Sequence, residues 1–135
     1  MKKILVGTDT SSSADLAVKA AAELARVNDA ELLVLHVRPP TQVFDAADPK
    51  KAADPDGYLA SMTARFPKVR IRSWSEPGDP AERLCEVAAD ERVDAIVVGN
   101  KGVQGPRWRV RESVPTMVVR HSPCSVFIVD TRSAQ

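Results

Sequence analysis

Cysteine is scarce in this sequence, which contains only Cys85 and Cys124. Two cysteines so far apart supply neither a disulfide framework nor the closely spaced ligand pairs of a zinc site. A reducing cytosol keeps such residues as thiols, and free cysteine is among the most commonly buried residue types. We therefore expect both cysteines to be structural.

Long apolar runs and a strong net charge are missing as well. No segment approaches the roughly 20 apolar residues that span a bilayer. The net charge is +1, so no overall field attracts nucleic acid or an anionic membrane, and the cluster of Arg107, Arg109 and Arg111 is typical of a solvated loop. The first residues lead into a strand-like run without an apolar leader segment. We expect a cytoplasmic protein with no nucleic-acid or membrane partner.

Recognisable catalytic groups are also few. Neither His36 nor His121 has a serine, aspartate or cysteine partner in a nucleophilic motif, or a second ligand at metal spacing. We expect His36 in the core or at the rim of a sheet, and His121 at the C-terminal end of a helix, where positive charge is favourable. The sequence also lacks a Walker-type lysine and a metal-binding carboxylate pair. It predicts no enzyme, and at most slow, incidental hydrolysis of ATP.

The chain does contain a regular alternation of apolar strands and amphipathic helices. Its 135 residues, 44% of them hydrophobic, are typical of one domain over residues 1–135. Strands separated by long helical segments indicate an open, doubly wound parallel sheet with helices on both faces. The expected strands are residues 4–6, 31–37, 69–74, 95–98 and 125–129, and the expected helices are residues 11–27, 56–66, from 80 onward and from 113 onward.

Local signals mark where two of these helices begin. Asp79 precedes Pro80, and Glu82 follows at the third helical position, which is a variant of the capping box. The serines at 11–13 offer N-caps for the first helix. The stretch 38–55 is rich in proline and aspartate, so we expect a surface loop there.

Glycine and polar residues follow the first and fourth expected strands, as 7–9 and 99–102. Ligands of open α/β sheets bind beyond the carboxyl ends of the strands, where the winding reverses. Glycine permits close backbone approach, and the carboxylate of Asp9 could accept hydrogen bonds from a ribose or an adenine amine. A strand-to-helix turn needs glycine in any case, and Asp9 equally fits a helix cap. The residues alone leave both interpretations open.

The loop after the fourth expected strand carries a recognisable spacing. Gly99 and Gly102 are followed, after nine residues, by Glu112 and Ser113. This spacing resembles the ATP-binding signature G-x2-G-x9-G-[ST] of the universal stress protein family. The resemblance extends over the whole chain and includes residues 3–9, 35–37, 78–81 and 121–129.

The resemblance implies a five-stranded parallel sheet in the order 3-2-1-4-5, with a nucleotide between the first and fourth strands. Asp9 would meet adenine or ribose, and the backbone of Val37 would lie against adenine. ATP or AMP is the implied cofactor, with magnesium only alongside ATP. Single-domain members often form homodimers through the last strand, here 126–129. The implied binding residues are Gly7, Thr8, Asp9, Val37, Gly99, Asn100, Gly102, Ser113, Val114 and Pro115.

Glu112 departs from the family pattern, because it stands where the signature has glycine. Its side chain would block close backbone approach and bring a negative charge toward the phosphates. At about 4–6 Å and an effective dielectric constant near 20, like charges cost roughly 3–4 kcal/mol per pair, or about a few hundredfold in affinity. Two explanations fit the neighbouring arginines 107, 109 and 111. Either they compensate this charge, or the sequence of the loop changed once nucleotide binding was lost.

We predict a stress-response module with a regulatory or sensor role, whose adenine-nucleotide cleft is altered by Glu112. In the alternative, Glu112 has abolished nucleotide binding, and the fold serves as a dimeric unit for binding a protein partner that the sequence does not identify. A nucleotidyl-transferring enzyme of the same architecture is disfavoured, because no HIGH-type or SGGxDS-type motif is present.

Overall fold

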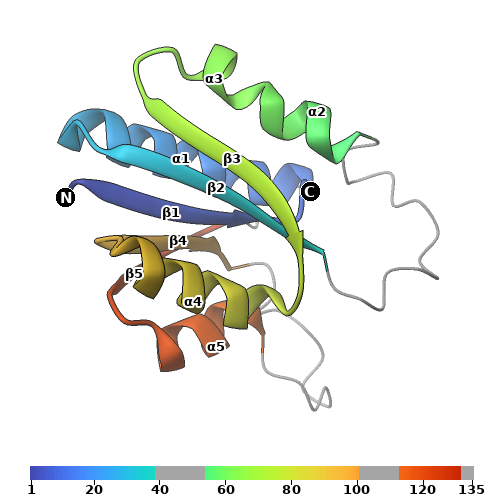
Figure 1. Ribbon diagram of the computed structural model, residues 1–135, viewed down its shortest axis with the longest axis vertical. Helices are drawn as coiled ribbons and strands as arrows, with labels where there is room; N and C mark the ends of the chain where they lie inside the picture. The colour runs from blue at the N-terminus through green and yellow to red at the C-terminus, as the bar shows by residue number, and fades with distance from the viewer. Residues whose placement is uncertain (39–53, 101–112, 132–135) are drawn as a thin grey trace.

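The computed structural model describes residues 1–38, 54–100 and 113–131. Their strands form one parallel sheet in the order β3-β2-β1-β4-β5 (Figure 1). The predicted fold class and strand order are confirmed. The strands are β1 (Lys3–Thr8), β2 (Glu31–Arg38), β3 (Arg70–Pro77), β4 (Ala95–Gly99) and β5 (Ser125–Val129).

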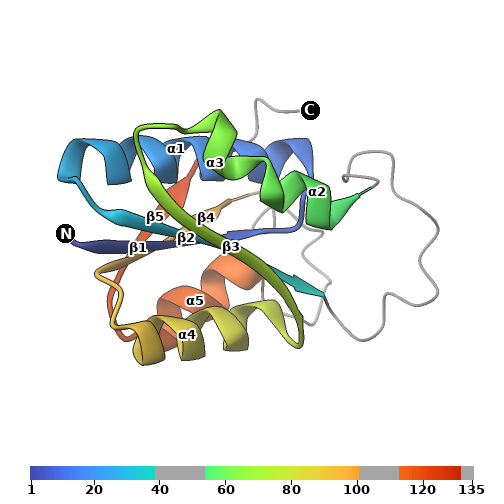
Figure 2. The same cartoon turned by 45° about the horizontal axis from the view of Figure 1, so that its top comes forward.

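Helices cover both faces of this sheet, as Figure 2 shows. On one face lie α1 (Ser12–Asn28) and the short helices α2 (Pro55–Ala60) and α3 (Met62–Arg65), and on the other lie α4 (Pro80–Glu91) and α5 (Val114–His121). Each face has its own apolar cluster, because successive side chains of a strand point to opposite faces. Ile4 of β1 packs in the cluster under α1, and the next residue, Leu5, packs in the cluster under α4.

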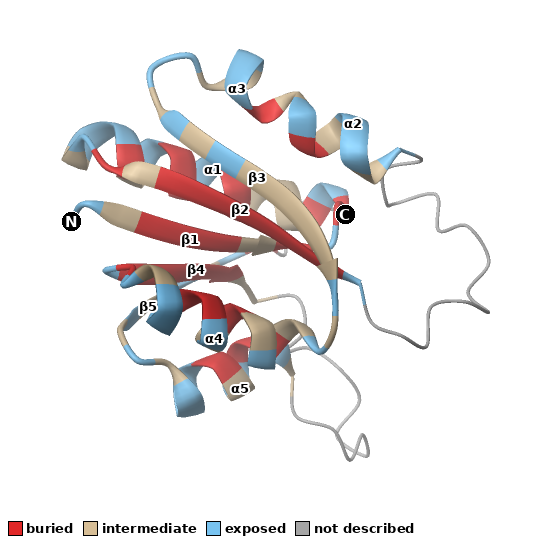
Figure 3. Ribbon diagram, viewed as in Figure 1, coloured by how far each residue is buried: buried red, intermediate tan, exposed pale blue. Residues whose placement is uncertain are grey.

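The central strands are buried on both faces, whereas the edge strands β3 and β5 are partly exposed (Figure 3). This burial explains why the central strands are continuous aliphatic runs and β3 alternates apolar with basic residues. His36 is buried on β2, with its Nδ1 atom 3.1 Å from Ser75 Oγ, and His121 is the last residue of α5. Both histidine predictions are confirmed.

The predicted helix starts are also observed. The N-cap of α1 is Ser11, whose Oγ accepts a hydrogen bond from the backbone N–H of Ala14 at 3.1 Å. The carboxylate of Asp79 caps α4 in the same way, accepting from the N–H of Glu82 at 3.0 Å. Ser113 is the N-cap of α5. Each cap satisfies a backbone donor that the first turn of a helix leaves unpaired.

The single helix expected over 56–66 is two short helices in the structure, α2 and α3, and β1 and β3 extend beyond the strands expected over 4–6 and 69–74. The interruption lies at Ser61, whose hydroxyl donates to the backbone carbonyl of Tyr58 at 2.6 Å. A serine side chain that bonds to a nearby backbone group competes with the helical hydrogen bonds. The loop expected over 38–55 lies largely outside the described residues.

The two cysteines are half-buried free thiols that pack beside the cluster under α4 and α5. Burial, and then the proximity of Cys124, raises the pKa of the Cys85 thiol. This setting agrees with the structural role predicted for them. Within the described part of the chain, no helix is long and apolar enough to cross a membrane.

Candidate functional site

A cavity of about 370 Å³ opens at the carboxyl ends of β1 and β4. These two strands are neighbours, and the chain winds away from them in opposite directions, so the loops that leave them diverge and form a crevice. The lining comes from β1, β2, β4, both helical layers and the segment after β5. The lining residues are Gly7, Thr8, Asp9, Ser11, Ser13, Ala14, Leu35, Val37, Pro80, Leu84, Val98, Gly99, Val114, Pro115 and Thr131.

Most of the binding residues implied by the motif gather around this cavity. Ser113 and Asn100 are described but do not line it. Gly102 and Glu112 lie outside the described residues, as do the arginines at 107, 109 and 111. Those that line the cavity are Gly7, Thr8, Asp9, Val37, Gly99, Val114 and Pro115.

The turn between β1 and α1 holds Asp9 at the cavity. Asp9 is not the helix cap, because Ser11 fills that position; instead, its Oδ1 accepts from the N–H of Ser11 at 2.9 Å. The Oγ1 of Thr8 accepts from the N–H of Thr10 at 2.9 Å, and Thr10 has the left-handed φ of 69°. A β-branched residue in this region stores strain of about 1–3 kcal/mol. The strained turn leaves the second carboxylate oxygen of Asp9 without a partner among the described residues.

The inner wall of the cavity is apolar. Leu35 and Val37 of β2 and Leu84 of α4 line it and are nearly inaccessible to water. A Cβ atom at Gly7 would come within 2.8 Å of Leu84, so glycine is what allows β1 and α4 to approach each other here. Apolar walls together with the Asp9 carboxylate suit a heterocycle that bears polar donors.

Thr131 is a lining residue that the motif did not indicate. It follows β5, is 1% exposed and has its methyl group 2.8 Å from where a Cβ of Gly99 would stand. The side-chain oxygen of Asn100 accepts from the backbone N–H of Thr131 at 2.9 Å and from its hydroxyl at 3.2 Å. Asn100 therefore turns toward the end of β5 and positions a wall of the cavity. The sequence did hold one signal for Thr131, because this residue comes just after the last strand, and parallel pairing brings that strand beside β4.

Replacing Asn100 with alanine is expected to loosen this wall. The backbone N–H and the hydroxyl of Thr131 would both lose their acceptor, which costs about 1–2 kcal/mol of unfolding free energy. Hydrogen exchange at the Thr131 amide, followed by NMR, should accelerate about five- to thirtyfold, which is what a loss of that size implies. Unchanged exchange at Thr131 would contradict the role given to Asn100.

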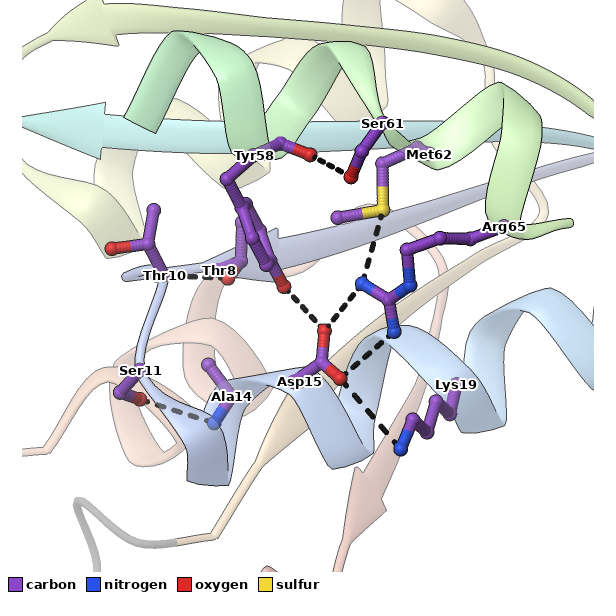
Figure 4. Close-up of polar contacts among 10 residues, drawn as sticks. All are labelled: Thr8, Thr10, Ser11, Ala14, Asp15, Lys19, Tyr58, Ser61, Met62 and Arg65. Carbon is purple, nitrogen blue, oxygen red and sulfur yellow. Dashed lines mark hydrogen bonds and ion pairs between the residues drawn. The ribbon is translucent and has the colours of Figure 1, made fainter. Parts of the chain in front are cut away.

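A polar cluster stands beside the cavity and joins α1 to α2 and α3 (Figure 4). The carboxylate of Asp15 accepts from the Tyr58 hydroxyl at 2.5 Å and from two nitrogens of Arg65, each at 2.8 Å. The ammonium group of Lys19 lies 3.8 Å from the same carboxylate. Burial by itself raises the pKa of Asp15, but the hydrogen bonds from Arg65 and Tyr58 outweigh it, so the pKa lies below its usual value. Burial and Asp15 raise the pKa of Tyr58 to about 12.

The described residues that line the cavity carry few ionisable groups. No histidine, lysine, arginine or cysteine is among the described lining residues, which leaves Asp9 as their one ionisable side chain. The described part of the chain also has no group of three or more His, Cys, Asp or Glu residues that could hold a metal ion.

Comparison with known proteins agrees with the fold and the motif. The model of the universal stress protein family matches residues 1–130. A universal stress protein of Mycobacterium tuberculosis is 31% identical, covering 96% of this chain and 97% of the relative. A putative universal stress protein of Staphylococcus saprophyticus is 30% identical, with 96% and 84% covered.

Solved structures show the same architecture. A universal stress protein in complex with cAMP superposes with a TM-score of 0.79 at 29% identity, covering 96% of this chain and 97% of that one. A universal stress protein from Archaeoglobus fulgidus in complex with dAMP has a TM-score of 0.67 at 19% identity, covering 95% and 97%, and this likeness concerns the fold alone.

Proposed function

Because this chain belongs to the universal stress protein family, we propose that it binds an adenine nucleotide in the cavity between β1 and β4. The observation that carries the proposal is a cavity lined both by apolar side chains and by the exposed carboxylate of Asp9. The cavity volume of about 370 Å³ is ordinary for a small-molecule site. The relative solved with cAMP, at 29% identity, supports the choice of an adenine ligand.

In this proposal the adenine ring lies against Leu35 and Val37, and the Asp9 oxygen that does not bind Ser11 accepts from a ribose hydroxyl or the adenine amine. The phosphates point toward Val114, at the N-terminal end of α5. Backbone N–H groups at a helix N-terminus favour anions, so this end of the cavity suits the phosphates.

We propose a regulatory or sensor role rather than catalysis. The described lining residues offer positioned polar groups but no evident general base for a water or a hydroxyl. ATP turnover should therefore stay well below about one per second, the lower end of ordinary enzymes.

We also propose that the protein forms a homodimer through β5. This strand lies at the edge of the sheet, and Phe127 and Ile128 on it are 41% and 50% exposed. An exposed edge carrying large apolar side chains is a surface that a second copy can cover.

Calorimetric titration with AMP and ATP, with and without magnesium at near-physiological salt, tests the proposed function. We expect AMP to bind, and ATP to bind more weakly because Glu112 opposes the added phosphates. Glu112→Gly should raise the ATP affinity at least tenfold while changing the AMP affinity little. Glu112→Gln is the matched control, because it removes the charge and keeps the bulk of the side chain.

The outcomes separate the candidate functions. Micromolar ATP binding by the unaltered protein would mean that the arginines at 107, 109 and 111 compensate Glu112. If neither nucleotide binds, even to Glu112→Gly, the proposal is wrong, and a dimeric protein–protein interaction module is favoured.

A further inference from the structure

A second cavity, of about 270 Å³, lies on the face of the sheet that α1, α2 and α3 cover. It runs between the outer side of α1 and the segment from the end of α3 to the start of β3, and we call it the α1–α3 groove. No described residue lines both this groove and the cavity between β1 and β4. Its lining residues are Lys19, Ala22, Glu23, Arg26, Arg65, Phe66, Pro67, Lys68 and Val69.

The floor of the α1–α3 groove is apolar. Ala22 is 3% exposed and belongs to the core cluster under α1, against which Phe66 and Val69 pack while remaining half-buried. The partly exposed area of these side chains faces the groove. Covering it would remove apolar surface from water, which is favourable for any ligand with an apolar body.

The rim of the groove is positively charged. Arg26 is paired with Glu23 at 2.5 Å, and Arg65 is paired with Asp15. Among the described residues, the one ion-pair partner of Lys19 is Asp15, which Arg65 already binds; the Lys19 ammonium group lies 3.8 Å from its carboxylate. Lys68 has no ion-pair partner among these residues. Among the described residues, four cations thus meet two carboxylates, which leaves two of these positive charges without a carboxylate partner there.

One of these cations is held rigidly. Asp15 binds the guanidinium group of Arg65 through two nitrogens, and the group lies 4.9 Å from the centre of the Phe66 ring (Figure 4 shows the contact with Asp15). A side chain that is already ordered loses little further freedom when a ligand binds beside it. Arg65 therefore forms a fixed, charged end wall for the apolar floor.

We propose that the α1–α3 groove is a second ligand site, which binds a small amphipathic anion made of one aromatic ring with a carboxylate. The volume lies below the ~300 Å³ at which drug-sized sites begin, which limits the occupant to about a dozen non-hydrogen atoms. The ring covers Ala22, Phe66 and Val69, and the carboxylate lies among Lys19, Lys68 and Arg65. With the binding free energy per non-hydrogen atom that is usual for small ligands, a ligand of this size binds with a Kd near 1 mM.

The test is a titration of the ¹⁵N-labelled protein followed by NMR, with three probes of similar size. Phenylacetate carries the negative charge, phenylacetamide is neutral and phenethylamine is positive. We expect phenylacetate to shift the amides of residues 19–26 and of residues 65, 66, 68 and 69. It should bind at least about fivefold more tightly than phenylacetamide, since each exposed charge pair contributes modestly. Equal affinity for the three probes, or shifts confined to other residues, would overturn the proposal.

Charge-reversal variants locate the anion. Lys68 is exposed and carries no structural ion pair among the described residues, so Lys68→Glu should fold normally and weaken phenylacetate binding about fivefold. Arg120→Glu makes the same change on α5, on the opposite face of the sheet, and should leave binding unchanged. If both variants weaken binding equally, the attraction comes from net charge and the site does not exist. Saturating AMP should not displace phenylacetate, so this result is independent of the nucleotide proposal.

Discussion

Replacing Asp15 with alanine is expected to lower the free energy of unfolding by about 3 kcal/mol. The Asp15 carboxylate binds both Tyr58 and Arg65, whose side chains come from the two short helices α2 and α3. Without it, a half-buried guanidinium group loses its bidentate partner, and a half-buried hydroxyl loses its acceptor. Helices of six and four residues have almost no stability of their own, so they depend on such tertiary contacts.

Urea unfolding followed by circular dichroism measures the effect. Asp90→Ala is the matched control, because Asp90 is exposed on α4 and should change stability by less than about 0.5 kcal/mol. Asp15→Asn keeps the shape of the side chain and part of its hydrogen bonding. Its loss of unfolding free energy should therefore lie between those of Asp15→Ala and Asp90→Ala. If Asp15→Ala costs no more than Asp90→Ala, the cluster does not hold α2 and α3 in place.

The same cluster predicts a pH dependence with a definite sign. The pKa of Asp15 is lowered in the folded protein, so its contribution is fully present above the unfolded value, about 3.9. It is lost as the pH falls through the lower folded value. The difference in stability between the unaltered protein and Asp15→Asn should therefore be constant from about pH 5 to 8 and shrink below about pH 4.

The second large effect is expected at the cavity between β1 and β4, where Asp9→Ala should weaken the proposed binding of AMP about 30- to 100-fold. Hydrogen bonds to a charged group contribute about 1.5–3 kcal/mol, and Asp9 is the one carboxylate among the described lining residues. Alanine also removes the acceptor that holds the N–H of Ser11, so some of the loss could come from a distorted turn.

Asp9→Asn separates these two causes. The asparagine oxygen can still accept from Ser11 and keep the turn, but the amide presents a donor where the ligand needs an acceptor. We expect this variant to be nearly as stable as the unaltered protein in thermal unfolding and still to lose most of its AMP affinity by calorimetry. Full affinity in Asp9→Asn would refute direct contact between the Asp9 charge and the nucleotide.

Much of the fold could be predicted from local patterns, because each signal acts within a few residues. The aliphatic runs at 31–37 and 95–98 predicted buried strands, and the strand expected at 125–129 has those same limits in the structure. Asp79 and Pro80 predicted the start of α4, since a cap depends only on the first turn of its helix. That residues 1–135 form one domain remains a prediction.

The position of the cavity between β1 and β4 could be predicted from the sequence, but not all of its lining residues could. The glycine and polar residues after β1 and β4 indicated it, because the carboxyl ends of parallel strands share one edge of the sheet. Their contact with a nucleotide remains a prediction, and Glu112 lies outside the described residues.

The sequence by itself determined the strands, the helix starts and the family. Only the tertiary structure decided that Asn100 faces Thr131 instead of the cavity, and that Asp15 joins Tyr58 and Arg65. These partners lie 31, 43 and 50 positions apart, and no local pattern specifies which side chains meet across such separations. Strand pairing and helix packing choose the contacts, because they fix the direction in which each side chain points.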